Sequence, residues 1–232
     1  VACRILCDRE KEIMDFIPEE FWNITALLKH KDSRKPLSAK FYGYGDKKTD
    51  IHNAQEAQAV VDASANADFS VTDIKVSERV RHAPPPFTTS SLQQEASRKL
   101  GFTTKLTMLI AQQLYEGVEI AGQGVTGLIT YIRTDSVRIA QEAQSQALEH
   151  ITTAYGAQYV PTKPNIYKGR KGAQDAHEAI RPSSVLNRPQ DVKVSLNNNQ
   201  YKLYKLIYER FLASQMSEAK YEVSAVSFGA NG

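Results

Sequence analysis

A tyrosine and an arginine two residues apart form the pair in this sequence best suited to chemistry on a phosphate group. Tyr131 and Arg133 belong to the segment GLITYIRTDS, which reads as a strand, and side chains two apart on a strand point to the same face. Arginine binds phosphate oxygens through paired N–H donors. A tyrosine hydroxyl can act as a nucleophile when a base or a positive charge lies near it. The alternative is that both side chains are structural.

A helix start is expected directly after this pair. Thr134, Asp135 and Ser136 are good N-cap residues for a helix predicted over 137–154, which ends before Gly156. Free backbone N–H groups at a helix N-terminus favour anions. The sequence therefore predicts a phosphate site at which the phenol, the guanidinium and the helix N-terminus converge.

The segment DAHEAIRP supplies a second group of polar side chains. Asp175 and Glu178 match a capping box, so a short helix is predicted that places His177 and Arg181 four residues apart on one face. A histidine and an arginine so placed can hold a phosphodiester, and the alternative is a surface helix with solvated charges. The basic loop before it adds Lys168 and Arg170 as candidate phosphate contacts.

Several patterns are absent from the sequence. It has no Asp-x-Asp pair, no His-Glu-x-x-His and no glycine-rich phosphate loop, so no metal site is predicted in this chain. Cys3 and Cys7 lack the spacing of a zinc site and are expected to be reduced core residues of a cytoplasmic protein. No signal peptide and no run of 18 apolar residues is present. The formal net charge of +3 leans only mildly toward polyanionic partners.

The chain divides at three consecutive prolines, 84–86, which fit neither a helix interior nor a central strand. Before them, a helix is predicted over 1–16, followed by a small α+β unit over 21–81. After them, two helices joined by a short glycine-containing link suggest a helix-turn-helix pair, with two packed core helices as the alternative. A long helix near 200–216 and a strand over 220–228, expected to return to the first sheet, complete the chain. Both chain ends look cut, so we expect a fragment.

Four motifs together resemble bacterial DNA topoisomerase I, a type IA topoisomerase. They are DREKEI, the stretch from PPPFTT to QQLYEG, GLITYIRTDS and DAHEAIRP, and they occur in the family's order between about residues 7 and 182. The resemblance implies an α+β multidomain fold with a helical, winged-helix-like domain that carries the catalytic tyrosine and a β-rich arch domain of the ring. On this basis the domains are a remnant helix of the base (1–20), the first part of the arch (21–83), the tyrosine domain (84–217) and a returning arch strand (218–232).

The resemblance also implies a function and a set of residue roles. Tyr131 would be the nucleophile and Arg133 the cation that positions it. His177 would bind the DNA backbone, and Arg181 would be a weaker contact. The partners would be single-stranded and negatively supercoiled DNA, for a monomer in the cytoplasm at the bacterial nucleoid. The Mg²⁺ of the full-length enzyme would be held by an N-terminal domain outside this chain, so the fragment alone is expected to be inactive.

Two other readings remain. One is a non-catalytic winged-helix module that binds nucleic acid through the helix at 105–116, which offers only Lys105 and a few glutamines for reading bases. The other is a hydrolytic nuclease that uses His177. That reading needs a metal or a second general acid, and the sequence shows neither.

Overall fold

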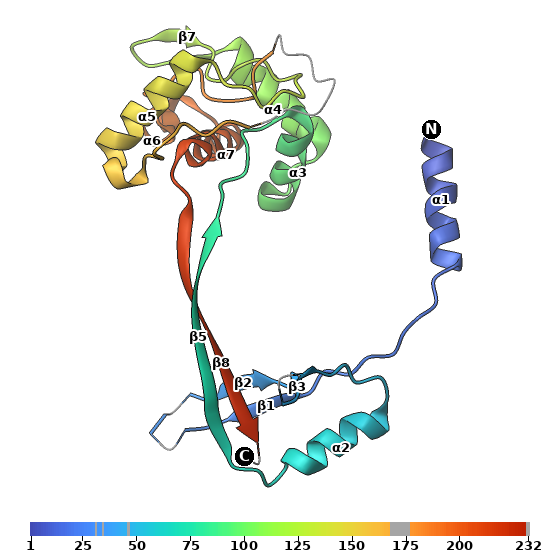
Figure 1. Ribbon diagram of the computed structural model, residues 1–232. Helices are drawn as coiled ribbons and strands as arrows, with labels where there is room; N and C mark the ends of the chain where they lie inside the picture. The colour runs from blue at the N-terminus through green and yellow to red at the C-terminus, as the bar shows by residue number, and fades with distance from the viewer. Residues whose placement is uncertain (31, 34, 46, 168–176, 231–232) are drawn as a thin grey trace. The chain divides into compact units, whose positions relative to one another are not determined.

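The computed structural model describes residues 1–30, 32–33, 35–45, 47–167 and 177–230. It divides into two compact units (Figure 1). One unit holds residues 1–77 together with 222–232, and the other holds residues 78–221. The names given above to four domains remain predictions.

The first unit contains short strands and one packed helix. Strands β1 (Thr25–Leu28) and β2 (Leu37–Lys40) pair antiparallel, as do β3 (Gly43–Tyr44) and β4 (Lys47–Lys48). Helix α2 (Ala54–Ser64) begins at Asn53, whose side chain accepts a hydrogen bond from the backbone of Glu56, as its predicted cap position requires. A small core of Ile51, Ala57 and Val60 joins this helix to the strands.

Helix α1 (Ala2–Met14) buries none of its residues. Its apolar side chains, among them Ile5 and Leu6, are exposed. Cys3 and Cys7 are exposed free thiols, so the prediction that they are core residues is wrong. The helical spacing was read correctly, but an apolar stripe becomes a core only where other side chains cover it.

Strands β5 (Phe69–Arg81) and β8 (Ala219–Ala230) form a separate two-stranded sheet. The last strand returns, as expected, to a strand of the unit predicted over 21–81, since it pairs with β5, but these two strands form a sheet separate from that of β1 and β2. Every residue of β5 is exposed. Hydrogen bonds between the two backbones therefore hold this ribbon, and burial of apolar side chains contributes little.

The second unit is helical and begins with the predicted helix pair. Helix α3 (Thr89–Leu100) starts with a capping box between Thr88 and Ser91 and ends at Gly101, which adopts a left-handed conformation with φ of 68°. Helix α4 (Thr104–Glu116) follows after a short link. A hairpin of β6 (Val118–Ile120) and β7 (Gly124–Thr126), which the sequence reading missed, comes next.

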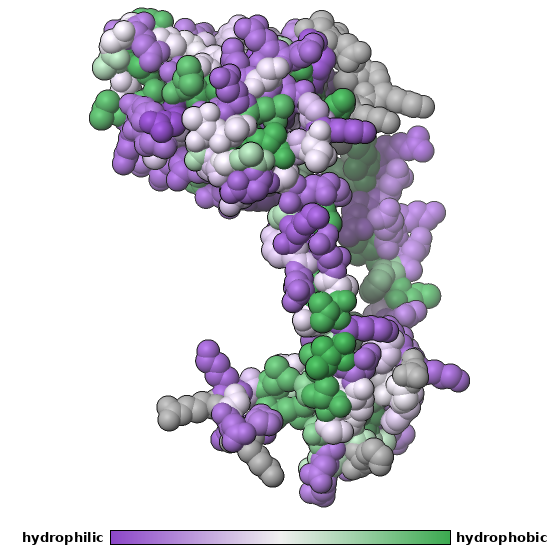
Figure 2. Space-filling view, turned by 60° about the vertical axis from the view of Figure 1, so that its left-hand side comes forward, coloured by the Kyte–Doolittle hydropathy of each residue, from purple (hydrophilic) through white to green (hydrophobic). Residues whose placement is uncertain are grey.

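Helix α7 (Asn198–Gln215) is the centre of this unit and contacts α3, α4, α5 (Gln141–Tyr155) and α6 (Pro189–Val192). Its side chains Leu203, Ile207 and Phe211 lie in a core shared with residues of α3 and α4. Hydrophilic side chains cover most of the face of this unit seen in Figure 2. Within the described part of the chain, no helix has the length and apolar character needed to cross a membrane.

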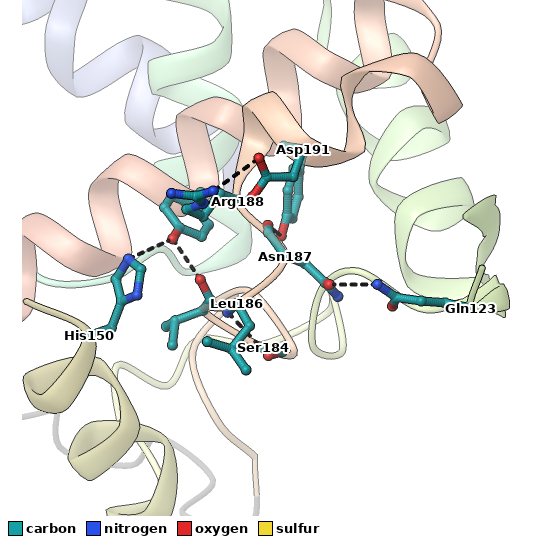
Figure 3. Close-up of polar contacts among 10 residues, drawn as sticks. Gln123, His150, Ser184, Leu186, Asn187, Arg188 and Asp191 are labelled. Carbon is teal, nitrogen blue, oxygen red and sulfur yellow. Dashed lines mark hydrogen bonds and ion pairs between the residues drawn. The ribbon is translucent and has the colours of Figure 1, made fainter. Parts of the chain in front are cut away.

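Two tyrosines of α7 fasten the loop that precedes α6. The Tyr208 hydroxyl donates to the carbonyl oxygen of Val185 at 2.7 Å, and the Tyr204 hydroxyl donates to that of Asn187 at 2.5 Å. Burial raises the pKa of Tyr208 to about 12, so this hydroxyl keeps its proton. His150 lies on the other side of Tyr208, with its Nε2 atom 3.3 Å from the hydroxyl oxygen (Figure 3).

We predict that His150 makes the protein less stable in mild acid. Burial, with a smaller contribution from the Arg188 charge, lowers the pKa of His150 below its ordinary value of about 6.5. The unfolded chain therefore binds this proton more readily than the folded one. The contribution of His150 to the free energy of unfolding is fully present above the ordinary histidine pKa, and it is lost as the pH falls toward the lowered pKa of the folded state.

Urea unfolding of wild type and His150→Gln at about pH 7.5 and about pH 5 measures this effect. The free energy of unfolding should fall less between about pH 7.5 and about pH 5 in His150→Gln than in wild type. An equal loss in both proteins would show that His150 does not carry it.

Candidate active site

Tyr131 lies on an extended segment that is fastened to residues 181–183. The backbone N–H of Thr130 donates to the carbonyl of Arg181 at 2.9 Å, and that of Ser183 donates to the carbonyl of Leu128 at 2.9 Å. An isolated bridge joins Ile129 to Pro182. The predicted strand is not formed, because the segment makes a few cross-links and then bends at residues 132 and 133.

The start of α3 and the residues before it hold the same segment from another direction. Thr89 donates its backbone N–H to the carbonyl of Thr134 at 2.9 Å. Its Oγ1 donates to the carbonyl of Ile132 at 2.7 Å and accepts the backbone N–H of Thr134 at 2.9 Å. The backbone N–H of Ile180 donates to the carbonyl of Phe87 at 2.8 Å. Three pieces of chain distant in sequence therefore meet at the tyrosine.

Alternating burial follows from this extended path. Ile132 and Thr134 are buried, whereas Tyr131, Arg133 and Asp135 are exposed. The inward side chains anchor the segment in the core, and the outward ones are exposed. The phenol and the guanidinium are therefore both open to solvent, and a shared side for the two stays a prediction.

The Tyr131 ring lies next to two other rings. Its centroid is 5.6 Å from that of Tyr115 in an edge-to-face arrangement and 5.5 Å from that of His177. The residue remains 40% exposed, so a large substrate can reach its hydroxyl. Tyr115 is the residue of this group that sequence reasoning missed, because its place in the last turn of α4 gives no sign of contact with Tyr131.

Arg133 and His177 line an open pocket beside the tyrosine. The other lining residues are Thr89, Ser90, Thr134 and Asp135. No ion pair of Arg133 occurs among the residues that the structure describes, so its charge is available to a ligand. Asp135 is the carboxylate in this lining, and it restricts where an anion can sit.

The helix N-terminus at this pocket belongs to α3, and the prediction that it would be the helix after Ser136 is wrong. Helix α5 begins only at Gln141, without a side-chain cap. Thr134 and Ser136 use their hydroxyls differently: they accept the backbone N–H groups of Ser136 and Arg138 at 3.0 and 3.1 Å. These local turns compete with helix formation and keep the chain extended past the tyrosine.

The predicted short helix around His177 and Arg181 is not formed between residues 177 and 182. Residues 179–182 are extended, because they pair with the segments on either side of them. The Nε atom of Arg181 donates to Glu178 at 2.7 Å, its Nη1 atom donates to the carbonyl of Pro182 at 2.9 Å, and the side chain is 12% exposed. Its role as a weaker phosphate contact stays a prediction. Lys168, Arg170 and Asp175 lie outside the described residues.

The described residues contain no group of three or more histidine, cysteine or acidic side chains that could hold a metal ion. The pocket itself contributes a single carboxylate and a single imidazole. Two potential ligands of this kind fall short of the set that a divalent cation needs.

Comparison with known proteins shows the family to which the chain belongs. A family model described as DNA topoisomerase matches residues 1–232, and the chain belongs to the type IA DNA topoisomerase family. It is similar to the solved structure of full-length topoisomerase I from Thermotoga maritima, with 37% sequence identity and a TM-score of 0.71. The match covers 96% of this chain and 34% of that one, so the chain spans about a third of the relative's length.

We predict that Thr89 holds the tyrosine segment in place. Thr89→Val removes the hydroxyl and leaves the Thr134 N–H and the Ile132 carbonyl without this partner, at a cost of about 1–3 kcal/mol in the free energy of unfolding. Thr89→Ser keeps both hydrogen bonds and should cost much less. Urea titration measures the difference, with Thr152→Val on α5 as a control whose hydroxyl bonds only to its own helix. Equal losses in all three variants would contradict the assignment.

Proposed function

We propose that this chain is the part of a type IA topoisomerase that cuts and rejoins one DNA strand, with Tyr131 as the nucleophile. The Tyr131 oxygen forms a bond to phosphorus, its proton leaves, and the bond from phosphorus to the 3′ oxygen breaks. The products are a 5′-phosphotyrosine and a free 3′-hydroxyl. Another strand passes through the gap, the hydroxyl attacks the phosphotyrosine, and negatively supercoiled DNA is relaxed. The observation that carries this proposal is the half-exposed Tyr131, two residues before the exposed Arg133 on the same segment.

Two side chains would act on the phosphate next to Tyr131. Arg133 lines the pocket without an ion pair among the described residues, so its guanidinium can bind the phosphate oxygens as charge develops on them. His177 lines the same pocket and contacts the Tyr131 ring, which suits a group that orients the DNA backbone. Electrostatic stabilisation of this kind is the main source of rate in phosphoryl transfer.

The chemistry of the tyrosine explains why the break can be resealed. A phenol has a pKa of about 10, well below that of an alkyl alcohol, so phenolate is the better leaving group when the 3′-hydroxyl attacks. The phosphotyrosine therefore keeps the energy of the original phosphodiester bond. No external energy source is needed for rejoining.

Further groups would come from outside this chain. Since the chain spans about a third of its relative, an N-terminal domain would add the acidic side chains that hold Mg²⁺ and a catalytic lysine. When bound, Mg²⁺ would supply positive charge near the DNA phosphates. The chain alone would bind single-stranded DNA weakly without cleaving it, and action as a monomer at the bacterial nucleoid is part of the same proposal.

A non-catalytic winged-helix module is the second candidate, because a hairpin follows the α3–α4 pair as a wing would. Helix α4 would then have to read base edges. It buries Thr107, Ile110, Ala111 and Leu114, and its exposed side includes Leu109 and Tyr115. Gln112 and Gln113 already hydrogen-bond to Glu116 and Gln200, which leaves few groups for reading bases, so the topoisomerase function is better supported.

We predict a covalent protein–DNA adduct that depends on the Tyr131 hydroxyl. Labelled single-stranded DNA is mixed with this chain, the separately produced N-terminal domain and Mg²⁺, and the products are separated on a denaturing gel. Wild type should give the adduct, and Tyr131→Phe should give none. Tyr115→Phe is the matched control, since it removes a hydroxyl from the neighbouring ring and should keep the adduct.

Arg133→Ala should lower the rate of adduct formation by about 10²-fold or more, because it removes an interaction with the phosphate in the transition state. Cut DNA with free ends on both sides would point to a nuclease. Duplex binding without any cutting would point to the winged-helix module.

A further inference from the structure

A second hollow on the helical unit is lined mainly by lysines and lies away from the tyrosine. Its walls come from the end of α3 and the first half of α7. We call it the lysine hollow, and its lining residues are Lys99, Leu100, Tyr201, Lys202, Lys205, Leu206 and Glu209. None of them lines the pocket next to Tyr131.

Helix α3 separates the two sites. Thr89 and Ser90 line the tyrosine pocket at the start of this helix, and Lys99 and Leu100 line the lysine hollow at its end. Ten residues of α-helix span about 15 Å, so one phosphate cannot occupy both places. The lysine hollow is therefore a separate potential site.

Positive charge exceeds negative charge around this hollow. We count the charged side chains that line the hollow, together with those that contact the lining residues or their ion-pair partners. There are six cations and two carboxylates, which leaves a surplus of four positive charges. They are Lys99, Lys202, Lys205, Arg98, Arg210 and Lys193 against Glu95 and Glu209. The formal charge of the whole chain is only +3. The surplus is thus concentrated in this region.

The ion pairs at the hollow leave its lysines available. Lys99 lies 3.0 Å from Glu95 and is the main partner of that carboxylate, which Arg98 and Arg210 also contact, so a phosphate would share Lys99 with Glu95. Lys205 and Glu209 are exposed and 3.6 Å apart, which makes a weak pair. Lys202 makes no ion pair within the described residues.

Tyr201 keeps one more cation next to the hollow. The Nζ atom of Lys193 lies 5.3 Å from the centroid of the Tyr201 ring, within the range of a cation–π contact. The ring thus holds this ammonium group at the edge of the site. Among the described residues, Lys193 makes no ion pair, so the group adds its charge there.

We propose that the lysine hollow binds the phosphodiester backbone of a DNA strand at a place separate from the phosphate that Tyr131 would attack. This inference rests on the proposed action of the chain on DNA. Lysine ammonium groups on flexible stems suit phosphates in any sequence, because they act as point charges without fixed geometry. Lys202 and Lys205, three residues apart on α7, are neighbours on its surface, and Lys99 faces them from α3.

The test is equilibrium binding of a fluorescent single-stranded oligonucleotide to this chain at several salt concentrations. The double substitution Lys202→Glu, Lys205→Glu should weaken binding about tenfold at low salt. It should also lower the slope of log affinity against log salt by about 1–2, since each lost phosphate contact removes about 0.7.

Lys163→Glu is the matched control. It reverses one charge on the loop that contains Asn165, whose side chain hydrogen-bonds to the Ser214 carbonyl near the C-terminal end of α7. It should change the slope of log affinity against log salt little. Equal effects of Lys163→Glu and of Lys202→Glu alone would overturn the proposal.

A second measurement avoids substitutions altogether. Acetylation of wild-type lysines with and without the oligonucleotide should show protection of Lys99, Lys202 and Lys205 but not of Lys163. Equal reactivity of these three lysines with and without the oligonucleotide would also overturn the proposal. Protection of the three lysines by an acidic polypeptide, without protection by DNA, would overturn it as well. Neither measurement depends on bond formation by the Tyr131 hydroxyl. A failure of cleavage and a failure of this site are therefore distinguishable.

Discussion

The candidate active site depends on backbone hydrogen bonds that tie together three extended segments, residues 87–89, 128–134 and 180–183. Apart from Thr89, the first residue of α3, these segments belong to no helix and to no long strand, so they could not keep their shape alone. Their inward side chains, Phe87, Ile132 and Ile180, are buried in the core of the helical unit. Since an unpaired backbone group in that core would be costly, the segments must pair with each other, and this pairing fixes the direction of each outward side chain.

This pairing explains why the tyrosine is both fixed and reachable. If the nucleophile lay within a helix or a central strand, the repeating backbone of that helix or strand would decide which side chains lie next to it. Here Tyr131 stands on a backbone held on both sides of it, at Thr130 and at Ile132, while its ring remains partly open to solvent. The rings of Tyr115 and His177 restrict its movement further, because each lies within stacking distance.

Much of the secondary structure was predictable from the sequence because its signals are local. The caps at Asn53 and Thr88, the glycine stop at 101 and the apolar stripe of α7 all act within a few residues. The alternating burial of residues 131–134 follows equally from spacing. The late start of α5 and the extended form of residues 179–182 were missed, because partners distant in sequence override local helix signals there. The approach of Tyr115 to Tyr131 also depends on tertiary packing and leaves no sequence signature.

Arg210 links the tyrosine pocket to the lysine hollow through direct contacts. Its guanidinium carbon lies 4.4 Å from the centroid of the Phe87 ring, and Phe87 lies two residues before Thr89 at the tyrosine pocket. Its Nη2 atom is 3.3 Å from Glu95, which also contacts Lys99 at the lysine hollow. Burial lowers the pKa of Arg210, while Glu95 opposes this shift, so the pair stays ionised inside the unit. Arg210 therefore stands between the ring of Phe87, two residues before the Thr89 anchor, and the carboxylate that Lys99 contacts.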